Sequence, residues 1–234
     1  MILTHGANSL PNAIPHLIAI CRGTASRGFG EVLYNANKTE LVSGVLDSPV
    51  YANVGNGQNV EHIVSSSNAD LMNRLLTGDF TIECYFKKNF DNEDGGSGSP
   101  IFGLISKSST LTWELAVACT KTGTFTLWVN DEYKINAVTS SAVITESYKH
   151  LALTKKTTDN KCQYSLYFNG NRLGSAVYQA QPITDCRFVM PIATKSTSYG
   201  NKYRVDWNVI QLCVWDYAKY TEPTYNIPTE VYPI

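Results

Sequence analysis

The sequence predicts an all-β protein in which two antiparallel sheets pack face to face as a sandwich. In residues 78–88, apolar side chains occupy every second position, which is typical of a strand with one buried face. These positions are Phe80, Ile82, Cys84 and Phe86. Asn169-Gly170 lies between two strand-like stretches and is a strong signal for a two-residue hairpin turn. Similar short patterns follow at short intervals without a long amphipathic helix, which favours a sandwich over an α/β fold.

The chain before this strand divides into an arm and several short elements. Residues 1–30 show no clean period and are interrupted by prolines and glycines, so we interpret them as an irregular N-terminal arm or docking segment. Short strands are expected at 31–35, 49–54 and 59–64. Residues 68–76 carry leucines at helical spacing behind a capping Ser67 or Asn68, so they are expected to form one or two helical turns.

The main domain is expected to cover residues 31–222, followed by a tail. Its later strands are expected at 101–107, 111–119, 124–129, 149–155, 162–169, 185–193 and 205–215. The tail, residues 223–234, contains three prolines, which exclude a helix or a central strand. Its apolar Val231, Tyr232 and Ile234 indicate that it packs along its own domain or against a neighbouring subunit.

Charge is sparse and balanced in this chain. It carries 19 basic and 20 acidic residues, a net charge of −1, and charged residues make up 17% against a typical ~25%. Nucleic acids and membrane surfaces are bound through clustered lysine and arginine, so neither is an expected partner. The N-terminus lacks the features of a secretion signal, and the apolar run 14–21 is too short to span a bilayer. We therefore expect synthesis in the cytoplasm without export or membrane insertion.

No cofactor is expected. The six cysteines are spread along the chain without a spacing suited to zinc, and a chain of this size does not need disulfides, so free thiols are favoured. The acidic, glycine-rich stretch 91–99 is interpreted as a flexible hairpin loop. A calcium site between Asp91 and Asp94 is the alternative, although the spacing does not fit an EF-hand.

Several segments resemble one family when they are taken in order. Gly78–Glu83 reads GDFTIE, Tyr148–Thr154 reads YKHLALT with Tyr148 where tryptophan is usual, and Ser165–Leu173 contains the Asn-Gly turn. With residues 209–221, they resemble the laminin-G-like, or concanavalin A-like lectin, jelly-roll family. The resemblance covers roughly residues 50–222. It implies a jelly roll that binds carbohydrate or protein ligands through its rim loops or its concave sheet.

A second, shorter resemblance lies at Leu3–Ser9, which is similar to the openings of bacteriophage and prophage structural proteins. Laminin-G-like modules normally act outside cells, and a virion protein is released by lysis without a secretion signal. The resemblance implies a head-fibre, decoration or tail-fibre-like virion protein, with residues 1–30 contacting other virion proteins. The apolar but irregular N-terminal segment also favours a homo-oligomer, with a trimer as the preferred state.

The sequence contains no constellation expected of an enzyme. Glycosidases of this fold carry paired carboxylates on one strand, close to the pattern E-x-D-x-x-E, whereas Glu83 and Glu114 each stand alone. His150 lies on a strand where the family has a histidine. We interpret it as hydrogen-bonded at a sheet face, because no catalytic partner is in view. No catalytic residue is therefore predicted, and a glycoside hydrolase is the least favoured function.

Aromatic residues near hairpin ends are the best candidates for ligand binding, because exposed rings stack on sugars and anchor protein interfaces. Tyr199 and Tyr203 lie in one polar loop, and Trp128 and Tyr133 flank the turn at 130–131. Burial in the core is an equally favoured interpretation of Trp128. The sequence thus favours a non-enzymatic virion protein with a host glycan as a candidate ligand. A bacterial carbohydrate-binding module is the alternative.

Overall fold

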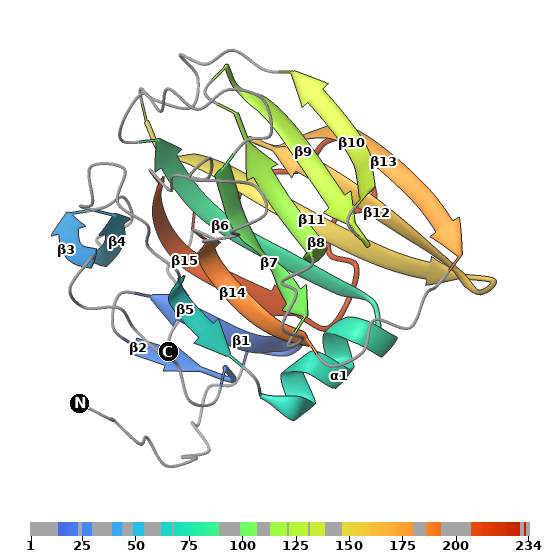
Figure 1. Cartoon of the computed structure of the whole chain (residues 1–234), viewed down its shortest axis with the longest axis horizontal. Coiled ribbons are helices and arrows are strands. Elements are labelled where there is room, and N and C mark those ends of the chain that lie inside the picture. The colour runs from blue at the N-terminus through green and yellow to red at the C-terminus, as the bar shows by residue number, and fades with distance from the viewer. Residues whose placement is uncertain are drawn as a thin grey trace.

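A computed structural model of the chain shows two antiparallel sheets stacked face to face (Figure 1). The structure describes residues 14–22, 25–29, 39–43, 49–53, 62–66, 68–88, 99–106, 113–120, 122–130, 132–138, 147–179, 186–192, 207–229 and 232. The acidic stretch 91–98 and the loop that carries Tyr199 and Tyr203 lie outside these residues.

The larger sheet has nine strands and the smaller has six. The main path of the nine-stranded sheet is β13 (Asn171–Gln179), β12 (Lys161–Phe168), β11 (Lys149–Thr158), β6 (Phe80–Lys88), β15 (Trp207–Trp215), β1 (Leu17–Arg22) and β2 (Ala25–Arg27). Off this path, β4 (Pro49–Asn53) pairs with β15 and with β3 (Thr39–Ser43). The six-stranded sheet runs β10 (Glu132–Val138), β9 (Thr124–Val129), β8 (Trp113–Cys119), β7 (Ser99–Ser106), β14 (Cys186–Ile192) and β5 (His62–Ser66). This arrangement confirms the predicted all-β, two-sheet antiparallel sandwich.

The core lies between the sheets and contains every second side chain of β6, as the alternation predicts. These side chains belong to Phe80, Ile82, Cys84 and Phe86, and all four are buried. The ring of Phe86 meets Phe125 of β9 edge to face at a centroid distance of 5.7 Å, so the two sheets are in direct contact. The other three side chains of the same stretch, Thr81, Glu83 and Tyr85, must therefore face away from the sandwich interior.

One helix, α1 (Ala69–Thr77), lies at one end of the sandwich (Figure 1). Asn68 caps it as expected, because its side-chain oxygen accepts hydrogen bonds from the backbone N–H of Asp70 (3.0 Å) and of Leu71 (3.2 Å). At the other end, the buried ammonium of Lys155 donates to the carbonyl oxygens of Leu75 and Leu76. The helix is thus held at both termini by polar contacts.

Replacing Asn68 with alanine should lower the free energy of unfolding by about 1 kcal/mol, because the first turn of α1 loses its cap. Urea denaturation measures this change. Asn73→Ala is the matched control, since Asn73 is exposed on the same helix and should shift stability by less than about 0.5 kcal/mol. Equal effects of the two variants would contradict the capping role.

The first described part of the chain differs from the expected irregular arm. Strand β1 pairs with β15 inside the nine-stranded sheet. Ala19 and Cys21 belong to the main core, whereas Leu17 and Ile20 are buried on the opposite face. A strand buried on both faces reads as a continuous apolar run and shows no period of two, which is why the sequence pattern concealed it. Residues 1–13 lie outside the described residues.

All six cysteines carry buried free thiols in this structure. They act as small apolar side chains, and five of them lie in the main core cluster: Cys21, Cys84, Cys119, Cys162 and Cys186. Burial raises the pKa of Cys84, and the charge of Glu83 raises it further. A thiol with a raised pKa is a poor nucleophile, so the structure gives Cys84 a packing role.

Candidate functional site

The outer face of the nine-stranded sheet is covered by the chain that follows β15. We call residues 216–229 and 232 the C-terminal segment. Pro223 accepts a hydrogen bond from the backbone N–H of Arg172 (2.8 Å), and Tyr225 donates its own N–H to Gly170 (2.9 Å). Farther along, the hydroxyl of Tyr85 donates to the carbonyl of Pro228. Of the two packing modes expected for the tail, the structure shows the one along its own domain.

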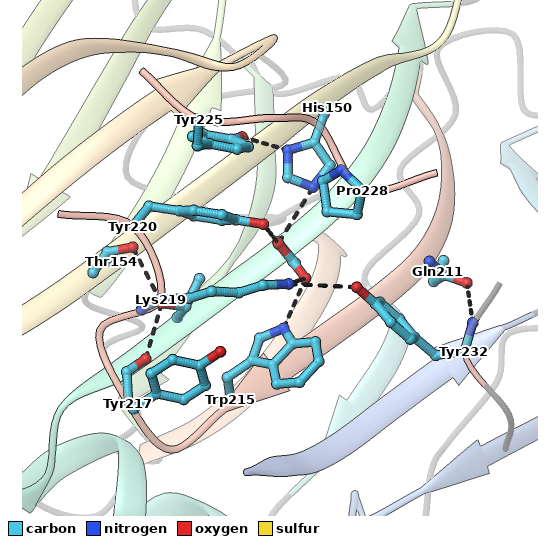
Figure 2. Close-up of polar contacts among 12 residues, drawn as sticks. His150, Thr154, Gln211, Trp215, Tyr217, Lys219, Tyr220, Tyr225, Pro228 and Tyr232 are labelled. Carbon is cyan, nitrogen blue, oxygen red and sulfur yellow. Dashed lines mark hydrogen bonds and ion pairs between the residues drawn. The ribbon is translucent and has the colours of Figure 1, made fainter. Parts of the chain in front are cut away.

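Glu83 of β6 is buried on this covered face. Figure 2 shows four residues that contact its carboxylate: His150, Trp215, Lys219 and Tyr220. Its Oε1 accepts hydrogen bonds from the indole Nε1 of Trp215 and from the ammonium of Lys219, both at 2.7 Å. Its Oε2 accepts from the hydroxyl of Tyr220 and lies 3.4 Å from Nε2 of His150. Both carboxylate oxygens are therefore occupied by groups of the chain itself.

Aromatic rings form a second layer around this carboxylate. Tyr220 stacks on Tyr225, with ring centroids 3.7 Å apart and an interplanar angle of 16°. The Tyr225 hydroxyl shares a 2.5 Å hydrogen bond with Nδ1 of His150. The ammonium of Lys219 also lies 4.0 Å from the ring centroid of Trp215, a cation–π contact. We call Glu83 and these five residues the Glu83 cluster.

The pKa of Glu83 reflects two opposing effects. Burial alone raises it, because a carboxylate loses its hydration when it leaves water. The hydrogen bond and charge of His150, followed by those of Lys219, outweigh burial and lower the pKa to about 2. Glu83 is therefore ionised across the physiological pH range, and its charge is balanced by Lys219.

This arrangement suits a structural contact better than catalysis. Only 2% of Glu83 and 1% of His150 are exposed, so neither side chain can reach a solvent-borne substrate. The structure does bring together Glu83 and His150, which the sequence placed on separate strands, and His150 is hydrogen-bonded at a sheet face as interpreted. The pKa of Tyr220 is also raised, first by burial and then by the charge of Glu83, which keeps its hydroxyl a donor.

Sequence reasoning missed the residues of the C-terminal segment that complete the cluster. Lys219 and Tyr220 contact Glu83 of β6 directly, although they lie more than 130 positions later in the chain. Tyr225 contacts His150, which in turn lies beside Glu83. The available signal was Glu83 itself, an ionisable residue on an otherwise uncharged strand face between Thr81 and Tyr85. When both faces of a strand are buried, an ionisable side chain on it must be hydrogen-bonded or paired with an opposite charge, because burying it alone is costly.

The predicted binding residues fall in a different part of the molecule. Trp128 is half-buried on β9, at a position that alternates with the core residues Leu127 and Val129. The backbone of Tyr133 on β10 is its register partner, so the structure places these two residues opposite each other on neighbouring strands. Tyr199 and Tyr203 lie outside the described residues.

Within the described ranges, no group of three or more His, Cys, Asp or Glu side chains is gathered as a metal ion would require. The possible calcium site at Asp91–Asp94 lies outside those ranges. In the same ranges, no helix has the length and apolar character needed to cross a bilayer.

Comparison with known proteins identifies relatives of this fold. Residues 59–219 match the family described as the Concanavalin A-like lectin/glucanases superfamily. No match is found among curated protein sequences. A sialidase of Trypanosoma rangeli, solved with the inhibitor DANA, is similar in structure with a TM-score of 0.58 and 11% identity, over 87% of this chain and 31% of the sialidase. The binding domain of botulinum neurotoxin serotype D/C has a TM-score of 0.54 and 12% identity, over 87% of this chain and 49% of that one. The chain thus spans about a third of the length of the sialidase.

Proposed function

We propose that this chain, which belongs to the concanavalin A-like lectin/glucanase superfamily, is a non-enzymatic binding protein whose ligand is a carbohydrate. The observation that carries the proposal is the closed state of the Glu83 cluster. The buried Glu83 and His150 are hydrogen-bonded by the chain's own side chains, so this acid–base pair is closed to substrate. A fold of this superfamily with such a closed centre is suited to binding rather than bond cleavage.

Aromatic side chains supply the binding surface in this proposal. Trp128 and Tyr133 are paired across β9 and β10, and an indole ring on the outer side of a sheet can stack on a sugar ring. Tyr199 and Tyr203 remain candidates from the sequence, on a separate loop. The surface would thus use apolar contact together with hydrogen bonds to sugar hydroxyls.

Glycan binding is tested with the purified full chain on an array of bacterial surface polysaccharides, followed by calorimetry on each hit. We expect saturable binding that weakens at least about tenfold in the Tyr199→Ala/Tyr203→Ala double variant or in Trp128→Ala, since each change removes a stacking ring. The thermal unfolding midpoint of each variant serves as the folding control. Absence of binding to any polysaccharide would contradict the carbohydrate proposal. Release of reducing sugar from a bound polysaccharide would contradict the non-enzymatic assignment.

We further propose that the protein is a component of a bacteriophage virion, assembled in the host cytoplasm as a homo-oligomer, with a trimer favoured. The support is the resemblance of Leu3–Ser9 to virion proteins. Residues 14–22 and 25–29 are part of the domain, so docking to other virion proteins would involve residues 1–13.

The virion assignment is tested by mass spectrometry of purified particles from the source host. We expect peptides of this chain in the particle fraction, and we expect multi-angle light scattering to give a trimer mass. A protein found only in the secreted or cell-surface fraction would instead support a bacterial carbohydrate-binding module. A clean monomer would contradict the oligomer.

A further inference from the structure

An exposed tyrosine lies just beside the Glu83 cluster, at the start of the C-terminal segment. Tyr217 and Val177 are the two large apolar residues that are exposed within the described ranges, at 37% and 59%. Val177 stands on the edge strand β13, whereas the ring of Tyr217 contacts His16 and follows Asp216, to which Arg74 is paired. An exposed aromatic ring with polar groups beside it can contact the apolar face of a ligand and hydrogen-bond to its polar groups.

Three charged or polar side chains form this border. Asp216 Oδ1 lies 2.9 Å from Nδ1 of His16, and Asp216 Oδ2 accepts a hydrogen bond from the Arg74 guanidinium at 3.2 Å. Arg74 also donates to Asp70 at 3.1 Å. These residues come from the turn before β1, from α1 and from the chain after β15, and the folded sandwich brings them to one place. We call Tyr217, His16, Asp216 and Arg74 the Tyr217 patch.

The patch is held rigidly by backbone contacts. Asp216 donates its backbone N–H to the carbonyl of His16 at 3.0 Å. The hydroxyl of the buried Thr81 donates to the carbonyl of Tyr217 at 3.0 Å. His16 has a φ of 67°, a left-handed conformation that is uncommon for residues other than glycine. Such a conformation persists where surrounding contacts impose it, and here the hydrogen bond from Asp216 to the His16 carbonyl is one such contact. The patch therefore has its binding geometry without a ligand.

Each side chain of the patch retains unused binding capacity. The side chains of His16, Arg74 and Asp216 are 63%, 44% and 27% exposed. The ring of Tyr217 leans on His16 at 5.2 Å and on Trp215 at 6.2 Å, and it remains partly open to solvent. Its hydroxyl has no hydrogen-bond partner among the described residues. The patch therefore offers an aromatic surface together with donors and acceptors at fixed positions.

Charge distinguishes between the possible ligands. The charges of Asp216 and Arg74 cancel, and Asp70, which pairs with Arg74 outside the patch, adds one negative charge, so the patch together with Asp70 carries −1 when His16 is neutral. The guanidinium is already paired with both carboxylates, and an anionic ligand would have to compete with them. A neutral, hydroxyl-rich ligand needs no such displacement.

We propose that the Tyr217 patch is a binding subsite for a neutral pyranose sugar, which stacks on Tyr217 and hydrogen-bonds through its hydroxyls to Asp216, His16 and Arg74. This inference rests on the proposed carbohydrate-binding function and assigns to it a site made of residues other than Trp128, Tyr133, Tyr199 and Tyr203. Stacking on one rigid ring with bordering hydrogen bonds is an adequate basis for weak, selective sugar binding.

The test uses the full chain and four soluble probes: cellohexaose, maltohexaose and mannohexaose as neutral sugars, and polygalacturonic acid as the acidic comparator. We expect calorimetry to show saturable binding of at least one neutral probe and weaker or no binding of the acidic one. Tyr217→Ala should weaken that binding at least about tenfold, which is typical of the loss of a central aromatic contact. Asp216→Asn should weaken it as well, without removing the ring.

Val177→Ala is the matched control, because it removes the other exposed apolar side chain and should leave binding unchanged. Thermal unfolding verifies that each variant is folded, and Asp216→Asn keeps the test valid if Tyr217→Ala is destabilised. Binding that survives both patch variants but is lost in Trp128→Ala would overturn this inference and leave the proposed function standing. Preference for the acidic probe would also overturn it. No binding of any polysaccharide on the array, or of any probe, would overturn both.

Discussion

Replacing Glu83 with glutamine should lower the free energy of unfolding by about 3 kcal/mol, the size expected when one partner of a buried ion pair is removed. The substitution keeps the side-chain shape but leaves the Lys219 ammonium, whose side chain is only 16% exposed, without its counter-charge. It also replaces one carboxylate oxygen by a donor, which cannot accept the hydrogen bonds now made to it. Urea denaturation followed by tryptophan fluorescence measures this loss.

Two further variants separate the charge from other effects. Glu222→Gln changes an exposed glutamate of the C-terminal segment and should shift stability by less than about 0.5 kcal/mol. In the Glu83→Gln/Lys219→Met double variant, the ammonium is removed as well. The decrease in the free energy of unfolding should therefore be smaller than the sum of the decreases in the two single variants. Strict additivity, or a Glu83→Gln effect as small as that of Glu222→Gln, would contradict the ion-pair explanation.

The same contacts explain how the C-terminal segment is positioned. Burying a carboxylate is costly, and it is tolerated here because donors arrive from both the sheet and the segment. Trp215 ends β15, and Lys219 and Tyr220 follow it within five residues. A shift of the segment along the sheet would leave Glu83 without partners, so the carboxylate selects one placement. That placement also brings Asp216 beside His16 and Arg74.

The sheet interior was predictable from the sequence because its signal is local. In β6, the alternation of Phe80, Ile82 and Phe86 is visible in seven consecutive residues, and it depends only on the geometry of a strand. Asn68 was likewise recognisable as a cap from its position before a helical pattern. Strand β1 was not, since burial on both of its faces removes the alternation by which a strand is recognised.

The Glu83 cluster could not be assembled from the sequence because its contacts are non-local. Trp215 and Tyr220 lie 132 and 137 positions from Glu83 in the chain. His150 was recognised as a strand histidine. Which residues of β6 lie beside it depends on the register between β6 and β11, and that register is not visible in the sequence. The register places His150 opposite Tyr85, two positions along the strands from the Ala152 and Glu83 pair. Only the folded sheet reveals that the acid and the imidazole meet.

Lowering the pH should reduce the free energy of unfolding of the wild-type protein more than that of Glu83→Gln. The pKa of Glu83 is about 2 in the folded state, below the ordinary value of 4.5 that applies when the chain is unfolded. The unfolded state therefore takes up the proton first as the pH falls, and the stabilisation is fully present above about 4.5 and disappears progressively toward about 2. The difference in the two pKa values corresponds to about 3 kcal/mol at neutral pH.

The measurement compares urea unfolding of wild type and Glu83→Gln at pH 7 and at pH 3, in the same buffer and at the same ionic strength. The difference in free energy of unfolding between the two proteins should be roughly half as large at pH 3 as at pH 7. At pH 3 the unfolded state binds a proton at Glu83 that the folded state largely does not, and this removes about half of the carboxylate's contribution to stability. Other carboxylates titrate equally in both proteins, and their effect cancels in the difference. A gap that stays constant, or that widens in acid, would show that Glu83 does not hold the C-terminal segment as an ionised group.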